Sequence, residues 1–226
     1  MRTALIALVV VVAAIIGYMF WSEMNTRLEP ALPKEEEQKQ VTVTSKTIQE
    51  DTDTYTINAQ YPQLGIASID TQVESTIKKV IDEFKGFGVK EPLVTSAKNE
   101  FTSTYDPPYI AEDIVSVRLT TSMYTGGAHS LATVGGLNFN RKTGELLQLS
   151  DALALINMQL SDVAAEALRQ MRQKHGDALF QEGLTATPEH YNTFVIDGTK
   201  VTFIFQLYQV VAYAAGFQEV AFPRKK

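Results

Sequence analysis

Tyr124-Thr125-Gly126-Gly127-Ala128-His129-Ser130 is the stretch around which this chain is organised, because two β-rich segments meet there. Residues 110–123 before it and 130–140 after it are rich in β-branched and aromatic residues, which favours strands. Between them, Gly126 and Gly127 indicate a turn or bulge whose backbone angles other residues rarely adopt. The stretch therefore predicts that two strands meet at a glycine-built turn.

Strands are also expected on both sides of this stretch. Residues 41–48 and 54–61 alternate and are joined by an acidic turn, which predicts a hairpin. Residues 191–196 and 200–207 flank an Asp197-Gly198 turn and form the clearest hairpin of the chain. Residues 141–144 form a hairpin loop in which Gly144 takes a positive φ. Further strands are expected at residues 98–105, 145–149 and 218–222.

Two helices are expected from the three-four spacing of apolar residues, which marks one buried helix face. The first runs from about Ile66 to Phe84, and the second includes Leu160 to Met171 and ends at Gly176. The order of strands, helix, strands, helix and strands predicts an α+β domain. Its sheet is expected to be mostly antiparallel, with the two main helices packed on one face.

The composition excludes several classes of protein. The chain has 226 residues, of which 45% are hydrophobic, and this content can fill the core of a domain. The formal net charge of −6 argues against nucleic-acid binding, which needs a basic surface. There is no cysteine, so disulfides, thiol catalysis and cysteine-ligated metals are excluded.

The N-terminus predicts attachment to a membrane. Residues 4–20 form an unbroken apolar run between Arg2 and Trp21, about long enough to cross a bilayer as a helix. The aromatic residues that close it favour an uncleaved signal-anchor, residues 1–21 with the span at 4–21, over a cleaved signal peptide. Arg2 on the short side predicts an inner-membrane, single-pass protein with its C-terminal domain in the periplasm or outside the cell.

Beyond the span, residues 22–40 are polar, charged and proline-containing, which predicts a flexible stalk. Residues 41–226 then form the exported α+β domain, with a subdivision near residue 125 as an alternative. Without Arg2, the exported part has 19 basic and 26 acidic residues and a net charge of −7. An acidic domain of this kind attracts basic partners.

His129 is the first candidate for chemistry, since the chain has only three histidines. In an extended segment, however, the side chains of His129 and Ser130 leave on opposite faces and cannot act together as base and nucleophile. His175 and His190 have no metal-ligand spacing. We therefore predict no catalytic residue, no metal site and no cofactor, and a structural role for His129 is favoured.

Several tyrosines are suited to protein or glycan contacts, although aromatic residues in strands more often pack internally. They are Tyr105, Tyr109, Tyr124, Tyr208 and Tyr213.

Three blocks of the sequence resemble a bacterial domain family. They are Tyr-Thr-Gly-Gly-Ala-His-Ser at 124–130, Leu-Asn-Phe-Asn-Arg-Lys-Thr-Gly-Glu at 137–145 with its continuation to Asp151, and Phe-Gln-Leu-Tyr-Gln-Val-Val-Ala-Tyr-Ala-Ala-Gly-Phe-Gln-Glu-Val at 205–220. These blocks are similar to the extracytoplasmic domain of the lysozyme-sensing anti-sigma factor RsiV and to the non-catalytic region of certain peptidoglycan deacetylases. The resemblance covers about residues 41–223. It implies a binding role outside the cytoplasm and does not carry over the sigma-binding segment or the catalytic domain of these proteins.

We therefore expect a membrane-anchored extracytoplasmic binding module for a cell-envelope ligand, either a lysozyme-like protein or peptidoglycan. The alternative is a cell-wall-active hydrolase or deacetylase-related enzyme that uses His129 with Asp106 or Asp113. The residues expected to contact the ligand are Tyr105, Tyr109, Tyr124, His129 and Tyr213. The glycines expected to be structural are Gly126, Gly127, Gly144 and Gly216.

Overall fold

The computed structural model describes residues 41–88 and 98–225, and residues 41–226 form one compact unit. The expected membrane span at 4–21 and the stalk at 22–40 lie outside the described residues. Among the helices that are described, none combines the length and the apolar content needed to cross a bilayer.

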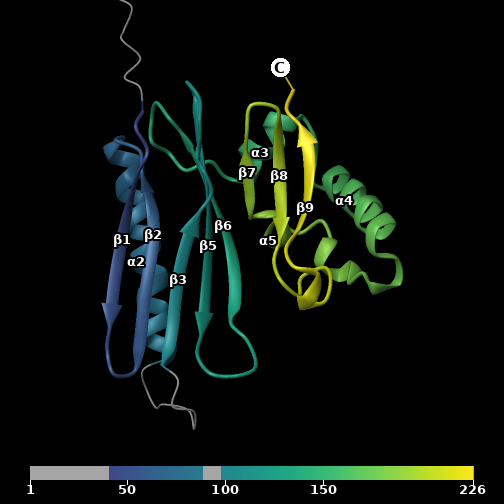
Figure 1. Cartoon of the computed structure of the whole chain (residues 1–226). Coiled ribbons are helices and arrows are strands. Elements are labelled where there is room, and N and C mark those ends of the chain that lie inside the picture. Colours follow the sequence, from purple (N-terminus) through teal and green to yellow (C-terminus); the bar gives the residue numbers. More distant parts are fainter. Residues whose placement is uncertain (1–40, 89–97, 226) are drawn as a thin grey trace, which may run out of the picture. The chain divides into compact units, whose positions relative to one another are not determined.

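The first half of the unit builds a six-stranded sheet, which we call sheet A. Its strands are β1 (Thr44–Asp51), β2 (Tyr55–Gln63), β3 (Asn99–Tyr105), β4 (Tyr109–Ile110), β5 (Ile114–Tyr124) and β6 (Leu131–Asn140). The order is β1-β2-β3-β5, and β5 also pairs with β4 and β6 (Figure 1). All pairs are antiparallel except β2 with β3, which is parallel.

The parallel pair follows from helix α2 (Ala67–Gly88), which connects β2 to β3. A helix of 22 residues is about 33 Å long and carries the chain back to the end of the sheet from which β2 started. Its apolar stripe packs on sheet A, and Figure 1 shows α2 behind the strands. The stripe residues Ile69, Val73, Ile77, Ile81 and Phe84 are all buried, so the helix expected from about Ile66 to Phe84 is confirmed.

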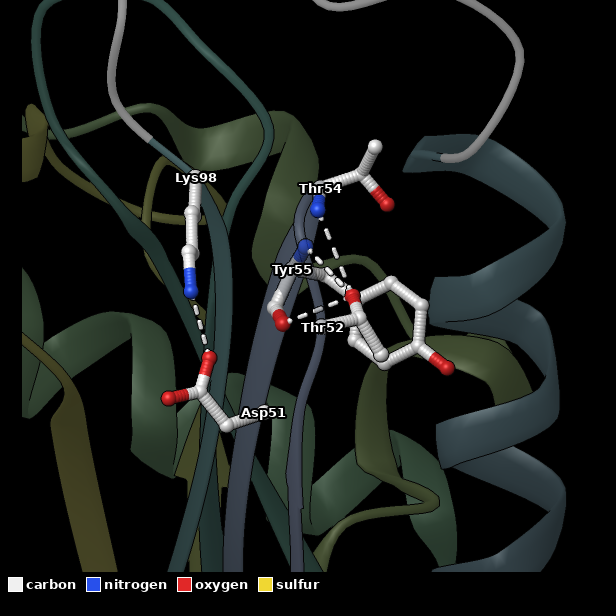
Figure 2. A network of polar contacts seen from close by, with 5 residues as sticks. All are labelled: Asp51, Thr52, Thr54, Tyr55 and Lys98. Carbon is white, nitrogen blue, oxygen red and sulfur yellow. Dashed lines mark hydrogen bonds and ion pairs between the residues drawn. The ribbon is translucent and has the colours of Figure 1, made fainter.

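The turn between β1 and β2 is held by Thr52, whose hydroxyl donates to the Tyr55 carbonyl and accepts from the Tyr55 N–H, both at 3.0 Å (Figure 2). The Lys98 ammonium, just before β3, bonds to the Asp51 carboxylate at 2.5 Å. A hydrogen bond from Lys85 of α2 lowers the pKa of Glu50. These contacts tie the β1–β2 hairpin to the helix and to the next strand.

The second half builds a smaller, antiparallel sheet B of order β7-β8-β9, with β7 at Phe194–Ile196, β8 at Lys200–Phe205 and β9 at Gln218–Pro223. Its core includes residues of α3 (Leu149–Ile156), α4 (Leu160–His175) and α5 (Pro188–Tyr191). The Tyr191 ring packs edge-to-face with the rings of Phe203 and Phe205, and the ring centroids are 5.6 Å apart in both pairs.

Two buried polar side chains of sheet A fasten sheet B to it. The Asn138 amide donates to the Phe194 carbonyl at 2.8 Å and accepts from the Ser116 hydroxyl at 2.6 Å. The same hydroxyl accepts the Ile196 N–H at 3.0 Å. Beside them, a Cβ on Gly136 would lie 1.9 Å from the Phe194 oxygen, so β7 approaches β6 at a distance that only glycine permits.

The α+β class and the mostly antiparallel pairing agree with expectation, but the single sheet with both helices on one face is incorrect. The strands form two sheets, and α2 packs on sheet A while α4 packs on sheet B. Residues 145–149 do not form a strand either. They make one bridge, Phe139 with Leu146, before α3 begins at Leu149, because Asp151 accepts the Gln148 N–H and caps that helix.

Candidate functional site

The glycine turn at the end of β5 has the geometry that its sequence indicates. Gly126 and Gly127 have φ values of 93° and 119°, which strongly favour glycine. The Tyr124 hydroxyl donates to the Gly127 carbonyl at 3.3 Å and closes the turn. The turn leaves His129 exposed to solvent two residues before β6 begins at Leu131.

His129 belongs to a stack of three aromatic side chains, His129, Tyr213 and Tyr208, which we call the aromatic stack. The ring centroids of His129 and Tyr213 are 4.1 Å apart, with an interplanar angle of 27°. The ring centroids of Tyr208 and Tyr213 are 5.5 Å apart. The Tyr213 hydroxyl donates to the Ser130 carbonyl at 2.8 Å, and Nδ1 of His129 donates to the same oxygen at 3.0 Å. Two segments about eighty residues apart in the sequence thus form one surface.

Tyr208 is held in a strained backbone conformation. Its φ is 65°, in the left-handed region that bulky residues avoid, yet 53% of its surface is exposed. Burial of the ring therefore does not explain the strain. Strain of this kind persists where the surrounding structure enforces it, and it gathers at functional sites.

Three glutamines enforce the path of residues 206–217, which connect β8 to β9 and carry Tyr208 and Tyr213. The Gln206 amide pairs with both the N–H and the C=O of Val134, at 3.1 and 2.8 Å, as a neighbouring strand would. The Gln209 amide donates to the carbonyls of Gly183 and His190 and accepts the Gln206 N–H. Together these bonds fix both sides of Tyr208.

The third glutamine, Gln218, is buried and fixes the far end of the same connection. Its NH2 group donates to the carbonyls of Ala215 and Gly216, at 2.7 and 3.2 Å. Its oxygen accepts from the Lys174 ammonium and from Nε2 of His175, both at 2.8 Å. His175 therefore has a structural role at the end of α4.

The structure brings only part of the expected contact set together. Tyr124, His129 and Tyr213 are associated through the glycine turn, whereas Tyr105 and Tyr109 are not. Tyr105 pairs with Leu119, five residues and about 17 Å along β5 from Tyr124, and it packs against the core under α2. Tyr109 pairs with Ser116 and packs against the core of sheet B. Both have packing roles.

The other two glycines also have positive φ. Gly144 has φ 76°, and a Cβ there would lie 2.4 Å from the Ser68 hydroxyl, so the loop fits against the start of α2. Gly216 has φ 71° and ends the 3-10 helix Tyr213–Ala215. Neither takes part in the aromatic stack.

The acids suggested as partners for His129 are at the opposite end of β5. Asp106 lies 3.6 Å from Arg118, six residues and about 20 Å from Tyr124, and Asp113 precedes the strand. Asp113 lines a hollow of about 390 Å³ that also contains Asp151 and Lys225 but no histidine. The described residues contain no cluster of three or more His, Asp or Glu that could hold a metal ion. The site offers aromatic faces and hydrogen-bonding groups.

Sequence reasoning named Tyr208 among the candidate aromatics but did not include it in the contact set. Its signal is in the 205–220 block, where glutamines at 206, 209 and 218 surround two tyrosines in a segment without strand or helix periodicity. Glutamines bonded to main-chain groups can build such a loop, but their spacing does not reveal which partners they take.

Two family profiles of known proteins match parts of this chain. Residues 48–132 match the profile described as "Deacetylase PdaC", and residues 155–225 match "Protein of unknown function (DUF3298)". Among curated proteins, the chain is similar to the peptidoglycan-N-acetylmuramic acid deacetylase PdaC of Bacillus subtilis (strain 168). The two are 24% identical over 219 residues, which is 94% of this chain and 46% of the relative. The chain thus spans about half of that protein.

Two crystal structures have a similar fold. A DUF3298 family protein of Pseudomonas aeruginosa PAO1 has a TM-score of 0.56 at 15% identity, and one of Bacteroides fragilis NCTC 9343 has 0.53 at 17%. Each comparison covers 81% of this chain and 90% of the other chain. The resemblance seen in the sequence blocks is confirmed: the chain contains a domain of largely unknown function that is related to the non-catalytic regions of peptidoglycan deacetylases.

Proposed function

We propose that this chain is a membrane-anchored, extracytoplasmic binding module that holds the glycan of peptidoglycan through the aromatic stack. The observation that carries the proposal is the stack itself: Tyr208, Tyr213 and His129, two of them exposed, arranged by a turn and a loop that glycines and glutamines fix. Tyrosine side chains supply a large, rigid contact area at a low cost in conformational entropy.

The chemistry of the stack suits a sugar. The faces of aromatic rings are negative, and they attract the partially positive C–H groups on the faces of sugar rings. Because His129 and Tyr208 are exposed and Nδ1 of His129 is already bonded, Nε2 of His129 and the Tyr208 hydroxyl are available for hydrogen bonds to hydroxyl or acetamido groups. No group of the stack carries a formal charge when the imidazole is neutral, and the uncharged N-acetylated sugar rings of a glycan match this.

Relatedness supports the same ligand. The curated relative is named for its action on N-acetylmuramic acid of peptidoglycan, and the similarity extends over 94% of this chain. A module shared with such an enzyme would serve to hold the polymer near a membrane. The apolar run at residues 4–21 would supply the anchor, placing the domain on the outer side of the inner membrane.

The experiment is co-sedimentation of the purified full-length protein with insoluble peptidoglycan. Tyr208→Ala is expected to weaken the affinity for peptidoglycan by about fivefold, since stacking contributes roughly 1 kcal/mol. Phe180→Ala is the matched control, because Phe180 is 42% exposed and lies outside the stack. Equal loss in both variants, or no sedimentation of the wild type, would contradict the proposal.

A parallel titration with a lysozyme separates the two ligand classes considered for this surface. Binding of a basic lysozyme without binding of peptidoglycan would replace the proposed ligand. Release of acetate or of muropeptides from peptidoglycan by the purified protein would favour the enzymatic alternative instead.

A further inference from the structure

The face of sheet A that α2 does not cover has an unusual composition. Figure 1 looks onto this face, with α2 behind the strands. Two successive rows of outward positions cross β1, β2, β3 and β5, and all eight carry neutral hydroxyl or amide side chains. One row is Gln49, Asn58, Thr102 and Ser122, which pair in this order across the sheet. The other joins Thr47, paired with Gln60, to Thr104, paired with Thr120, since Gln60 and Thr104 directly follow the last β2–β3 pair, Ala59 with Ser103. We call these eight residues the polar grid.

The side chains of the polar grid are available to a ligand. All those on β1, β2 and β3 are exposed, and Thr120 and Ser122 on β5 are partly exposed. Across residues 41–88 and 98–225, none of the eight side chains makes a hydrogen bond, although side-chain bonds are numerous elsewhere in the fold. The grid is therefore an ordered set of donors and acceptors that no other described residue pairs with.

The spacing of the grid is regular. Neighbouring strands place groups about 5 Å apart, and alternate residues on one strand lie about 7 Å apart. Each hydroxyl or amide can both donate and accept. The area spans four strands, about 14 Å across, and is wider than one sugar ring.

The grid continues toward the aromatic stack. In the register of sheet A, Ser122 lies two residues before Tyr124, on the same face of β5. The Tyr124 hydroxyl then bonds to Gly127 in the turn that carries His129. On the other side, Thr120 pairs with Val134, whose main chain is bonded to the Gln206 amide beside Tyr208.

We propose that the polar grid is the track of an extended, uncharged, N-acetylated glycan chain, one end of which rests on the aromatic stack. This inference rests on the proposed function and adds that several consecutive sugars are bound. The grid has no apolar side chain to drive association with a protein. Arg118, two residues from Thr120 on the same face of β5, is paired with Asp106 and Glu219, so this neighbouring cation is not free to attract nucleic acid or an anionic membrane. Rows of neutral donors and acceptors match the hydroxyl and acetamido groups that repeat along such a chain. The solvent side of α2 differs, since it carries charged residues such as Glu74 and Lys78.

The test is calorimetric titration of the purified full-length protein with N-acetylglucosamine oligomers of two and of six sugars. The hexamer is expected to bind at least tenfold more tightly than the dimer. The double variant Asn58→Ala and Thr102→Ala is expected to remove this advantage, because two hydrogen-bonding positions together contribute about a tenfold change in affinity. Ser75→Ala, an exposed hydroxyl on α2, is the matched control and should change neither affinity.

The outcomes separate this inference from the proposed function. The dimer and the hexamer could bind with equal affinity, or the double variant could still bind the hexamer more tightly than the dimer by the same factor. Either result would overturn the proposed role of the grid while leaving the stack as a sugar site. Loss of dimer and hexamer binding together in Tyr208→Ala, with length dependence lost only in the grid variant, supports both. Failure of the wild type to bind either oligomer or peptidoglycan would overturn both.

Discussion

At the scale of the residue, the Tyr208 side chain is expected to lower the stability of the fold while it contributes to ligand binding. Replacing it with glycine removes the penalty of a bulky residue at φ 65°, which is about 1–3 kcal/mol, at an entropic cost of about 0.5–1 kcal/mol in the unfolded chain. We expect Tyr208→Gly to raise the free energy of unfolding by roughly 1 kcal/mol while peptidoglycan binding falls. Urea unfolding and co-sedimentation measure the two effects.

Asn157→Gly is the control for the Tyr208→Gly variant. Asn157 also has positive φ, 54°, but it lies at the exposed end of α3, outside the stack. Because asparagine tolerates this conformation, its replacement should change stability little and binding not at all. A Tyr208→Gly protein that is less stable than the wild type would show that the ring holds the loop in place.

A second residue, Tyr191, gives the stability a pH dependence. Burial raises the pKa of Tyr191 to about 12, and its hydroxyl donates to the Leu184 carbonyl at 2.9 Å. Above pH 10 the unfolded chain loses this proton while the folded chain keeps it, so the free energy of unfolding falls as pH rises from about 10 to 12. The fall due to this group is at most about 2 kcal/mol.

Tyr191→Phe isolates this effect. At pH 9 the variant should be less stable by about 1 kcal/mol, since the Leu184 carbonyl loses its partner. Between pH 10 and 12 the difference should shrink and then reverse, because the wild type loses up to about 2 kcal/mol while phenylalanine does not titrate. Urea unfolding at pH 9 and pH 11.5 tests this, and a constant difference would mean that Tyr191 is accessible to water in the folded state.

At the scale of the element, the junction between the sheets depends on Gly136. A Cβ there would lie 1.9 Å from the Phe194 carbonyl oxygen, so β7 has to move and weaken the bonds to Ser116 and Asn138. We expect Gly136→Ala to lower stability by about 1–3 kcal/mol. Gly135→Ala, whose Cβ would have no neighbour within 4 Å, should be tolerated; similar melting temperatures for the two variants would rule out the close approach.

The same junction shows where sequence reasoning stops. Periodicity predicts α2 and the β7–β8 hairpin because it reports which side chains are buried. It does not report which strands are neighbours, so the parallel β2–β3 pair and the division into two sheets were not predicted. Ser116 and Asn138 are polar residues in buried positions, and they indicate a junction only once Phe194 and Ile196 are placed beside them.

The candidate site, too, could be predicted from the sequence only in part. The glycine turn is readable from the sequence, because positive φ has a residue signature. The stacking of His129 on Tyr213 depends on a hydrogen bond to Ser130 and on glutamines bonded to distant carbonyls, none of which leaves a periodic pattern. The sequence therefore identified part of the stack together with tyrosines that pack elsewhere.

At the scale of the whole molecule, residues 41–226 form a compact unit that contains both hydrophobic clusters and the aromatic stack. If residues 4–21 act only as an anchor, binding and membrane attachment are separable properties. A chain that begins at Val41 should then keep the melting temperature and the peptidoglycan affinity of the full-length protein, and should lose only its place in the membrane fraction.

Carbonate washing of membranes is the measurement that distinguishes the forms, because it releases peripheral proteins and retains those inserted through an apolar helix. The full-length chain should stay in the membrane fraction, and protease added outside spheroplasts should digest its domain. A soluble form that begins near residue 22 would show that the apolar run is a cleaved signal peptide. The module would then reach its glycan by diffusion, and binding by the chain from Val41 would be unaffected.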